Sequence, residues 1–169
     1  MYKGYALKSC HTVTLLAVLC FSSTTQAQSQ AQRDVEYLQE FIVPLAKLQL
    51  EKQGHFLPLG AALKQTDKFV LMPASTAAMA LLPADIIKLI QEALVQGADD
   101  GEYKTTALAY DATVPLPSSG KQSDAIAVAL DHRDGYSIIT FLPYELRGKK
   151  VHMGTPFTRQ GTATVFKQK

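Results

Sequence analysis

Residues 124–144 read DAIAVALDHRDGYSIITFLPY, and this stretch decides the fold. Two apolar segments, Ala125–His132 and Tyr136–Tyr144, flank the polar tripeptide Arg133–Gly135. An Asp-Gly pair supplies the left-handed backbone position that a short hairpin loop needs. The pattern therefore predicts two antiparallel strands joined by a three-residue loop.

The loop also predicts which residues of the two strands lie opposite each other, because side chains alternate between the faces of a strand. One face then carries bulky pairs, which are Leu130 with Ile138, Val128 with Thr140 and Ile126 with Leu142. The other face carries Ala129 with Ile139 and Ala127 with Phe141, and we expect Ala107 and Ala109 of the preceding strand to join it. Both faces of the hairpin are apolar.

The second of these faces predicts a recognition surface. Two helices cover a sheet incompletely, and an exposed apolar patch marks a dimer or ligand surface. We expect the surface to consist of Ala127, Ala129, Ile139 and Phe141. In the alternative interpretation the face is covered by the Ala-rich start of the second helix, by edge segments or by the long loop of residues 115–122.

Apolar spacing predicts two helices. From Arg33 to Gln53 apolar residues recur every three or four positions, and Gly54 is placed as a helix stop. Pro44 lies inside this segment and predicts a kink or break near residues 40–41. A second helix opens at Pro83 and is expected to stop at Gly97.

Other segments predict strands. Phe56–Leu63 and Phe69–Met72 flank a polar turn and read as a strand pair, and the period becomes two from Tyr103 onward. Lys150–Met153 and Thr162–Phe166 are typical of weaker edge strands. Gly60 is expected to allow close packing against a helix.

Strands that arrive in hairpin-linked groups indicate an antiparallel sheet with helices on one face. We therefore predict an α+β fold with two main helices and a sheet of about five strands. The expected order is helix, strand, strand, helix, strand, strand, strand. Residues 33–169 would form a single domain, preceded by a flexible start at residues 28–32.

Residues 1–27 predict a secretory signal peptide. Lys3 and Lys8 precede an apolar stretch at Val13–Phe21. Small residues at Thr25 and Ala27 fit the best cleavage site, and those at Ser29 and Ala31 fit a second one. A transmembrane anchor would need about 20 apolar residues, and lipid attachment at Cys20 would need a small residue in place of Leu19. We expect a periplasmic or secreted bacterial protein with no stable membrane anchor.

Composition excludes several function classes for the mature chain. Both cysteines, Cys10 and Cys20, fall in the signal, which leaves no disulfide, thiolate metal site or cysteine nucleophile. Beyond the signal, 15 basic residues balance 15 acidic ones, so there is no charge excess for binding nucleic acid. The expected partner is a protein, a second copy of the chain or a small ligand.

The densest titratable cluster is Asp131-His132-Arg133-Asp134. His132 between Asp131 and Asp134 could act as a general base or share a metal with them. The cluster lies at a hairpin tip, however, where Asp and Gly serve turn geometry and adjacent residues point to opposite faces. We interpret it as structural and expect no catalytic residue, metal or cofactor. Of the other histidines, His55 reads as a helix cap and His152 as a surface residue.

Two motifs carry a family resemblance. Phe56–Leu63, FLPLGAAL, and Asp124–Arg133, DAIAVALDHR, with Gly135 and the FLPY of Phe141–Tyr144, resemble a family of small uncharacterised bacterial proteins. The similarity spans about residues 37–166 and implies a shared fold without an activity. The order of elements is also similar to that of roadblock and profilin-like domains, which often dimerise and act as binding platforms.

These observations favour an exported binding or interaction module that lacks enzymatic activity and associates through the sheet, with a partner or with itself. One alternative is a periplasmic hydrolase or metal-dependent enzyme that uses Asp131, His132 and Asp134. Another is an inhibitor or immunity-like protein.

Overall fold

The computed structural model describes residues 29–72 and 81–166, and the predicted signal peptide lies outside them. The elements in chain order are α1 (Gln30–Gln53), β1 (Leu59–Lys64), β2 (Phe69–Met72), α2 (Pro83–Asp99), β3 (Tyr103–Pro115), β4 (Gln122–His132), β5 (Ser137–Arg147), β6 (Lys150–Met153) and β7 (Phe157–Gln160). The predicted α+β class and element order are confirmed. Within the described residues the sheet has seven strands, however, and not about five.

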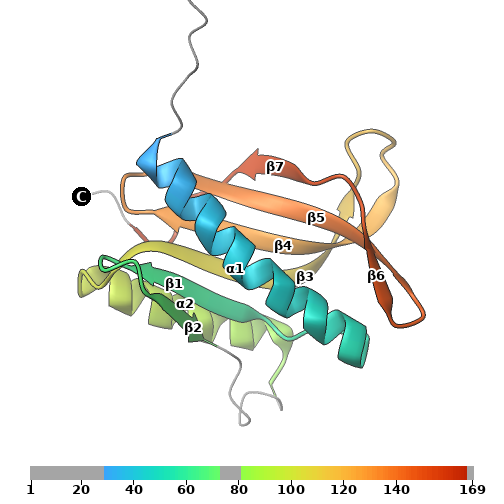
Figure 1. The fold of residues 1–169 in the computed structure, drawn as a ribbon, viewed down its shortest axis with the longest axis horizontal. Helices are drawn as coiled ribbons and strands as arrows, with labels where there is room; N and C mark the ends of the chain where they lie inside the picture. Colours follow the sequence, from blue (N-terminus) through green and yellow to red (C-terminus); the bar gives the residue numbers. More distant parts are fainter. Residues whose placement is uncertain (1–28, 73–80, 167–169) are drawn as a thin grey trace, which may run out of the picture.

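All strand pairs are antiparallel, in the order β2-β1-β3-β4-β5-β6, with β7 also paired to β5. Helix α1 crosses one face over β1, β3 and β4, whereas α2 packs on the opposite face against β1 and β3 (Figure 1). The expectation of both helices on one face is therefore wrong. Both faces of the central strands are apolar, so each needs its own cover.

The β4–β5 hairpin has the predicted register. Ala129 lies opposite Ile139 and Ala127 opposite Phe141. The His132 N–H donates to the Tyr136 carbonyl at 2.8 Å, and Gly135 has the left-handed φ of 85° that the loop requires. The Asp-Gly signal thus identified both the loop and the pairing of the strands.

The register of β3 corrects one expectation. Ala107 lies opposite Leu130 and Ala109 opposite Val128, on the face that α1 covers. These two alanines therefore do not join Ala127 and Ala129. Alternation along β3 instead places the side chains of Leu108 and Tyr110 on the opposite face of the sheet, where α2 packs.

Helix α1 begins earlier than predicted and continues past its proline. Ser29 and Gln32 form a capping box, so residues 30–32 belong to the helix and not to a flexible start. No break occurs at Pro44, because the buried stripe of Leu38, Ile42, Ala46 and Leu50 holds both sides of the proline against the sheet. Gly54 ends the helix in a left-handed conformation, as predicted.

Two glycines at the contact between α2 and the sheet, Gly60 on β1 and Gly97 on α2, allow close packing. A Cβ at Gly60 would lie 2.4 Å from Cγ2 of Ile90, which confirms the predicted helix contact. Gly97 is not the helix stop that the sequence indicated, because α2 continues to Asp99. A Cβ at Gly97 would lie 2.0 Å from the ring of Tyr103, so this glycine makes room for the first residue of β3.

The C-terminal region differs from the prediction. Lys150–Met153 is strand β6 as expected, but Thr162–Phe166 is not a strand. The last strand is β7, and it pairs with β5 from Ile138 to Phe141. Residues 161–166 turn back over the sheet face opposite α1, where hydrogen bonds to the Asp131 side chain hold Thr164 and Val165.

Candidate functional site

The predicted surface lies on the sheet face opposite α1, which we call the second face. Ala127 and Phe141 are buried there, and Ala129 and Ile139 are partly exposed. Helix α2 packs only on the β1 and β3 side of this face (Figure 1). Helix α2 therefore does not cover the part of this face formed by β4 and β5, and other segments or a ligand must cover it.

Strand β7 supplies part of the cover. The Phe157 ring stacks on Phe141 with centroids 5.2 Å apart. The guanidinium of Arg159 lies 5.3 Å from the Phe141 ring and 5.7 Å from the Phe157 ring, a cation–π arrangement. An edge segment thus covers Phe141, which was one of the alternatives that the sequence left open. Most of the Ala-rich segment before α2 lies outside the described residues.

A hollow of about 280 Å³ lies between α2 and the residues after β7. We call it the α2 hollow. Its apolar lining includes Leu108, Tyr110, Ala129 and Ile139. Gln91 and Thr162 are among the polar residues that line it. Two of the four predicted surface residues, Ala129 and Ile139, therefore line a concave site.

A larger hollow of about 510 Å³ lies toward the β5–β6 hairpin. We call it the β6 hollow. Its apolar lining is Leu116, Pro117, Pro143, Met153, Pro156 and Phe157. Its polar lining includes Glu145, Arg147 and His152, and Arg147 donates to Glu145 at 2.7 Å. His152 is exposed, as predicted, and sequence reasoning did not place it beside a cavity.

A band of apolar side chains connects the two hollows. Tyr110 and Ile139 of the α2 hollow pack in one cluster with Phe141 and with Phe157 of the β6 hollow. This second-face strip consists of Tyr110, Ala127, Ala129, Ile139, Phe141 and Phe157. Apolar surface with a few polar groups at its rim is the usual character of a ligand site.

Asp131 anchors the segment that borders the α2 hollow. Its Oδ2 accepts from the Thr164 N–H at 3.1 Å, the Thr164 hydroxyl at 3.3 Å and the Val165 N–H at 3.2 Å. Its Oδ1 accepts from the Ser137 hydroxyl at 2.5 Å. This buried carboxylate fixes the C-terminal segment to the β4–β5 hairpin, which is a structural function.

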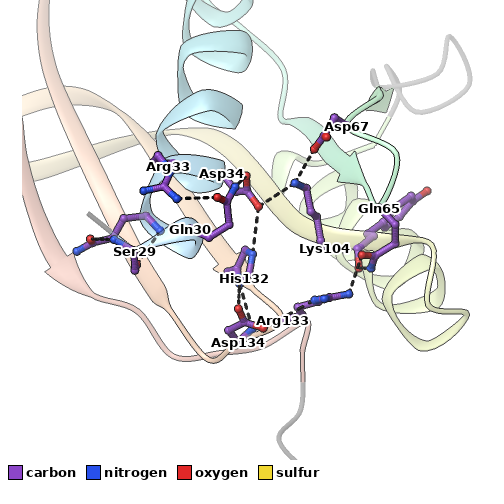
Figure 2. Close-up of polar contacts among 12 residues, drawn as sticks. Ser29, Gln30, Arg33, Asp34, Gln65, Asp67, Lys104, His132, Arg133 and Asp134 are labelled. Atoms are coloured by element: carbon purple, nitrogen blue, oxygen red, sulfur yellow. Dashed lines mark hydrogen bonds and ion pairs between the residues drawn. The ribbon is translucent and has the colours of Figure 1, made fainter. Parts of the chain in front are cut away.

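His132 points to the other face of the hairpin, as alternation predicts. Its Nε2 lies 3.4 Å from Oδ2 of Asp34 on α1, and its Nδ1 accepts from the Asp134 N–H at 3.0 Å (Figure 2). Because Nδ1 accepts a hydrogen bond, the neutral ring carries its proton on Nε2, toward Asp34. Both ring nitrogens are therefore engaged within the protein.

Lys104 completes this network on the α1 face. Its Nζ lies 2.9 Å from Oδ2 of Asp34 and 2.6 Å from Oδ1 of Asp67 (Figure 2). Burial by itself raises the pKa of Asp34, but hydrogen bonds from Lys104 and Gln30 outweigh burial and bring it below its ordinary value. Burial by itself lowers the pKa of Lys104, and the two carboxylates outweigh it and raise that pKa. The network ties α1 to β3 and to the β4–β5 loop.

The arrangement brings only part of the predicted catalytic cluster together. Asp134 and His132 are in contact, whereas Asp131 lies on the opposite face. His132 is 3% exposed, and neither hollow is lined by it. Sequence reasoning missed Asp34 and Lys104 as its neighbours. The signal was present for Asp34, an acidic residue at a position where α1 is otherwise buried and apolar.

His55 lies at the end of α1, where its Nδ1 is 3.2 Å from the carbonyl oxygen of Gln53, in agreement with the predicted cap. In residues 29–72 and 81–166 no three or more His, Cys, Asp or Glu side chains are grouped so that they could hold a metal ion. No helix in the same ranges is long and apolar enough to cross a membrane.

Comparisons of the chain with protein-family models, curated proteins and solved structures find no match. The site must therefore be interpreted from its own geometry.

Proposed function

We propose that this protein is an exported binding module without enzymatic activity, and that it takes an apolar ligand on the second-face strip. The observation that carries the proposal is that the strip, which is buried at its centre around Ala127 and Phe141, ends in an open hollow on each side, lined by Ala129 and Ile139 at one end and by Phe157 at the other. The hollows of about 280 and 510 Å³ fall near or within the range of about 300–1,000 Å³ for small-molecule sites. A partner protein could occupy the same strip with one apolar side chain in each hollow.

The geometry offers less support to the rival proposal of a hydrolase or metal-dependent enzyme. A general base must reach the proton it removes, directly or through one water molecule. His132 is buried, and its two nitrogens already contact Asp34 and Asp134. An inhibitor or immunity-like protein would be a special case of the binding module, with a protein as the ligand.

Replacing Ile139 with Glu should weaken binding at the strip at least tenfold. Ile139 lines the α2 hollow and is only partly buried, so the variant should fold. The probe is 8-anilinonaphthalene-1-sulfonate, whose fluorescence rises in apolar sites. We expect the wild type to bind it and the variant to bind at least tenfold more weakly, because a carboxylate in the hollow is costly to desolvate and repels the anionic dye.

Leu89→Glu is the matched control, since Leu89 is 51% exposed on α2 and lines neither hollow. It should leave dye binding unchanged. A wild type that binds no dye, or equal losses in both variants, would contradict a ligand site at the strip.

The proposal of export has its own test. We expect the protein that the cell accumulates to begin at Gln28, after cleavage behind Ala27. Mass spectrometry of the purified protein measures this directly. A chain that retains residues 1–27 would count against export by this signal, without affecting the binding proposal.

A further inference from the structure

Strand β2 forms an edge of the sheet and pairs only with β1 in the described part of the chain (Figure 1). The Lys64 N–H donates to the Lys68 carbonyl at 2.9 Å, so the backbone groups of Lys68 point toward β1. In an antiparallel ladder alternate residues point to the same neighbour. Val70 and Met72 therefore also face β1, and Phe69 and Leu71 present their N–H and C=O groups outward.

Helix α1 adds apolar side chains beside this edge. Helical spacing places Tyr37, Phe41, Pro44, Leu45 and Leu48 on one flank of the helix. The Phe69 ring lies 4.3 Å from that of Phe41 and 4.7 Å from that of Tyr37, so this flank faces β2.

Part of this surface is open to solvent. Tyr37 is 51% exposed, Leu48 46% and Leu71 40%. These values are among the highest for large apolar side chains in the described residues. Natural proteins usually protect a sheet edge with charges, prolines, bulges or a very short strand. Strand β2 is short, with four residues, but between Phe69 and Met72 its edge carries no charge, proline or bulge.

We propose that the β2 edge and the apolar flank of α1 form an interface between two copies of this chain. A two-fold axis through Val70 places Phe69 of one copy opposite Leu71 of the other, and the reverse. The outward N–H and C=O groups of these residues then form about four hydrogen bonds. The alternative register centred on Leu71 would need an N–H from Pro73, which proline lacks.

The side chains are compatible with this self-pairing. Phe69 meets Leu71 on the α1 face, and Val70 meets its own copy on the α2 face. A two-fold axis perpendicular to the sheet also brings both apolar α1 flanks to the same side of the combined sheet. An isologous contact therefore matches apolar groups with apolar groups along the whole strand.

The charges are compatible as well. The Asp67 carboxylate is held by Lys104 at 2.6 Å, which leaves Lys68 as the charged residue nearest the edge. In the proposed register the two Lys68 residues lie at opposite ends of the paired strands, about 13 Å apart at 3.3 Å per residue. Because this exceeds the Debye length of about 8 Å, their repulsion is small.

Sedimentation velocity of the purified protein over a range of concentrations tests the dimer. We expect a concentration-dependent monomer–dimer equilibrium for the wild type. Leu71→Lys should raise the dimer dissociation constant at least tenfold, since it places a charge opposite Phe69 of the other copy. Leu89→Lys, on the exposed side of α2, should leave it unchanged. A wild type that stays monomeric at about 100 μM, or a Leu71→Lys variant that dimerises like the wild type, would overturn the proposal.

A cross-link tests the register independently of the lysine variant. Val70 pairs with Val70 at a non-hydrogen-bonded position, where Cα atoms are about 4.5 Å apart and a disulfide can form. In a chain with Cys10→Ser and Cys20→Ser, Val70→Cys should form a covalent dimer on mild oxidation, well before Leu82→Cys at the exposed N-cap of α2. Equal rates for the two thiols, or a cross-link to a different protein in place of a second copy, would refute a two-fold contact at β2.

Discussion

Replacing Lys104 with Met is expected to lower the free energy of unfolding by about 3 kcal/mol at neutral pH. Lys104 lies between Asp34 and Asp67, and the Asp34 side chain is 7% exposed. Removal of one partner from a buried ion pair leaves a charge without compensation, which typically costs about 3–5 kcal/mol. The remaining neighbours of Asp34, Gln30 and His132, are at 2.7 and 3.4 Å and offset part of this loss.

The cost of Lys104→Met should depend on pH in a defined direction. In the wild type the pKa of Asp34 lies below its ordinary value of 3.8, so its stabilisation is present above pH 3.8 and is lost as the pH falls through the folded pKa. Without Lys104, burial raises the pKa of Asp34, and the carboxyl can take up a proton at a higher pH. The difference between wild type and variant should therefore be largest near pH 7 and shrink toward pH 4.

Urea denaturation of both proteins at several pH values measures this difference. Lys64→Met is the matched control, because Lys64 pairs with Glu102 at 2.9 Å on the exposed surface. Exposed pairs contribute little, so the control should unfold nearly as the wild type does. A penalty for Lys104→Met that is no larger than that of the control, or that does not change with pH, would show that the network does not hold α1 to the sheet.

The parts of the fold that could be predicted from the sequence are those fixed by local signals. The Asp134-Gly135 pair determines a loop whose geometry leaves one register for β4 and β5, and that register is confirmed. Gly54 and Pro83 end one helix and begin the other as predicted. In each case neighbouring residues determine the conformation, so no distant contact is required.

The errors arise where tertiary contacts override a local signal. Gly97 has the form of a helix stop, but the Tyr103 ring packs against it and the helix continues. Pro44 has the form of a helix break, but buried residues on both sides keep the helix intact. The placement of the two helices on opposite faces depends on how β1 inserts beside β3, and no local pattern encodes that choice.

In the candidate site, too, local signals predict some features, and tertiary contacts determine the others. Ala129 and Ile139 could be predicted because period two along a strand assigns each side chain to a face. The contact of His132 with Asp34 joins residues 98 positions apart, and the sequence offers only the weak signal of an acid on an apolar helix face. The hollows depend on where β7 and the C-terminal segment turn back, which the Gly and Pro residues near them do not determine.

Replacing Asp131 with Ala should lower the free energy of unfolding about as much as Lys104→Met does. Unlike Lys104→Met, it should also loosen one segment, the residues after β7, more than the rest of the sheet. The carboxylate accepts four hydrogen bonds, from Ser137, Thr164 and Val165, and it is 6% exposed. An unsatisfied buried donor costs about 1–3 kcal/mol, so we expect the free energy of unfolding to fall by about 3 kcal/mol. The loss of free energy is smaller than four unsatisfied donors would give, because solvent can reach some of these donors once the C-terminal segment moves.

The local consequence is what distinguishes this variant from Lys104→Met. The segment after β7 borders the α2 hollow, and its Val165 belongs to the same buried apolar cluster as Leu94 and Tyr103. Without Asp131 the amide hydrogens of Thr164 and Val165 lose their acceptor and should exchange at nearly the rate of unprotected amides. Amides in the centre of β4, which exchange only on global unfolding, should accelerate by about a hundredfold, the factor that about 3 kcal/mol corresponds to, and remain protected. Hydrogen exchange followed by mass spectrometry resolves the two regions.

Asp124→Ala, at an exposed position of the same strand, is the control and should change exchange in neither region. Uniform acceleration across the sheet would mean that Asp131 supports the hairpin as a whole, and that the C-terminal border of the hollow is held by apolar packing instead.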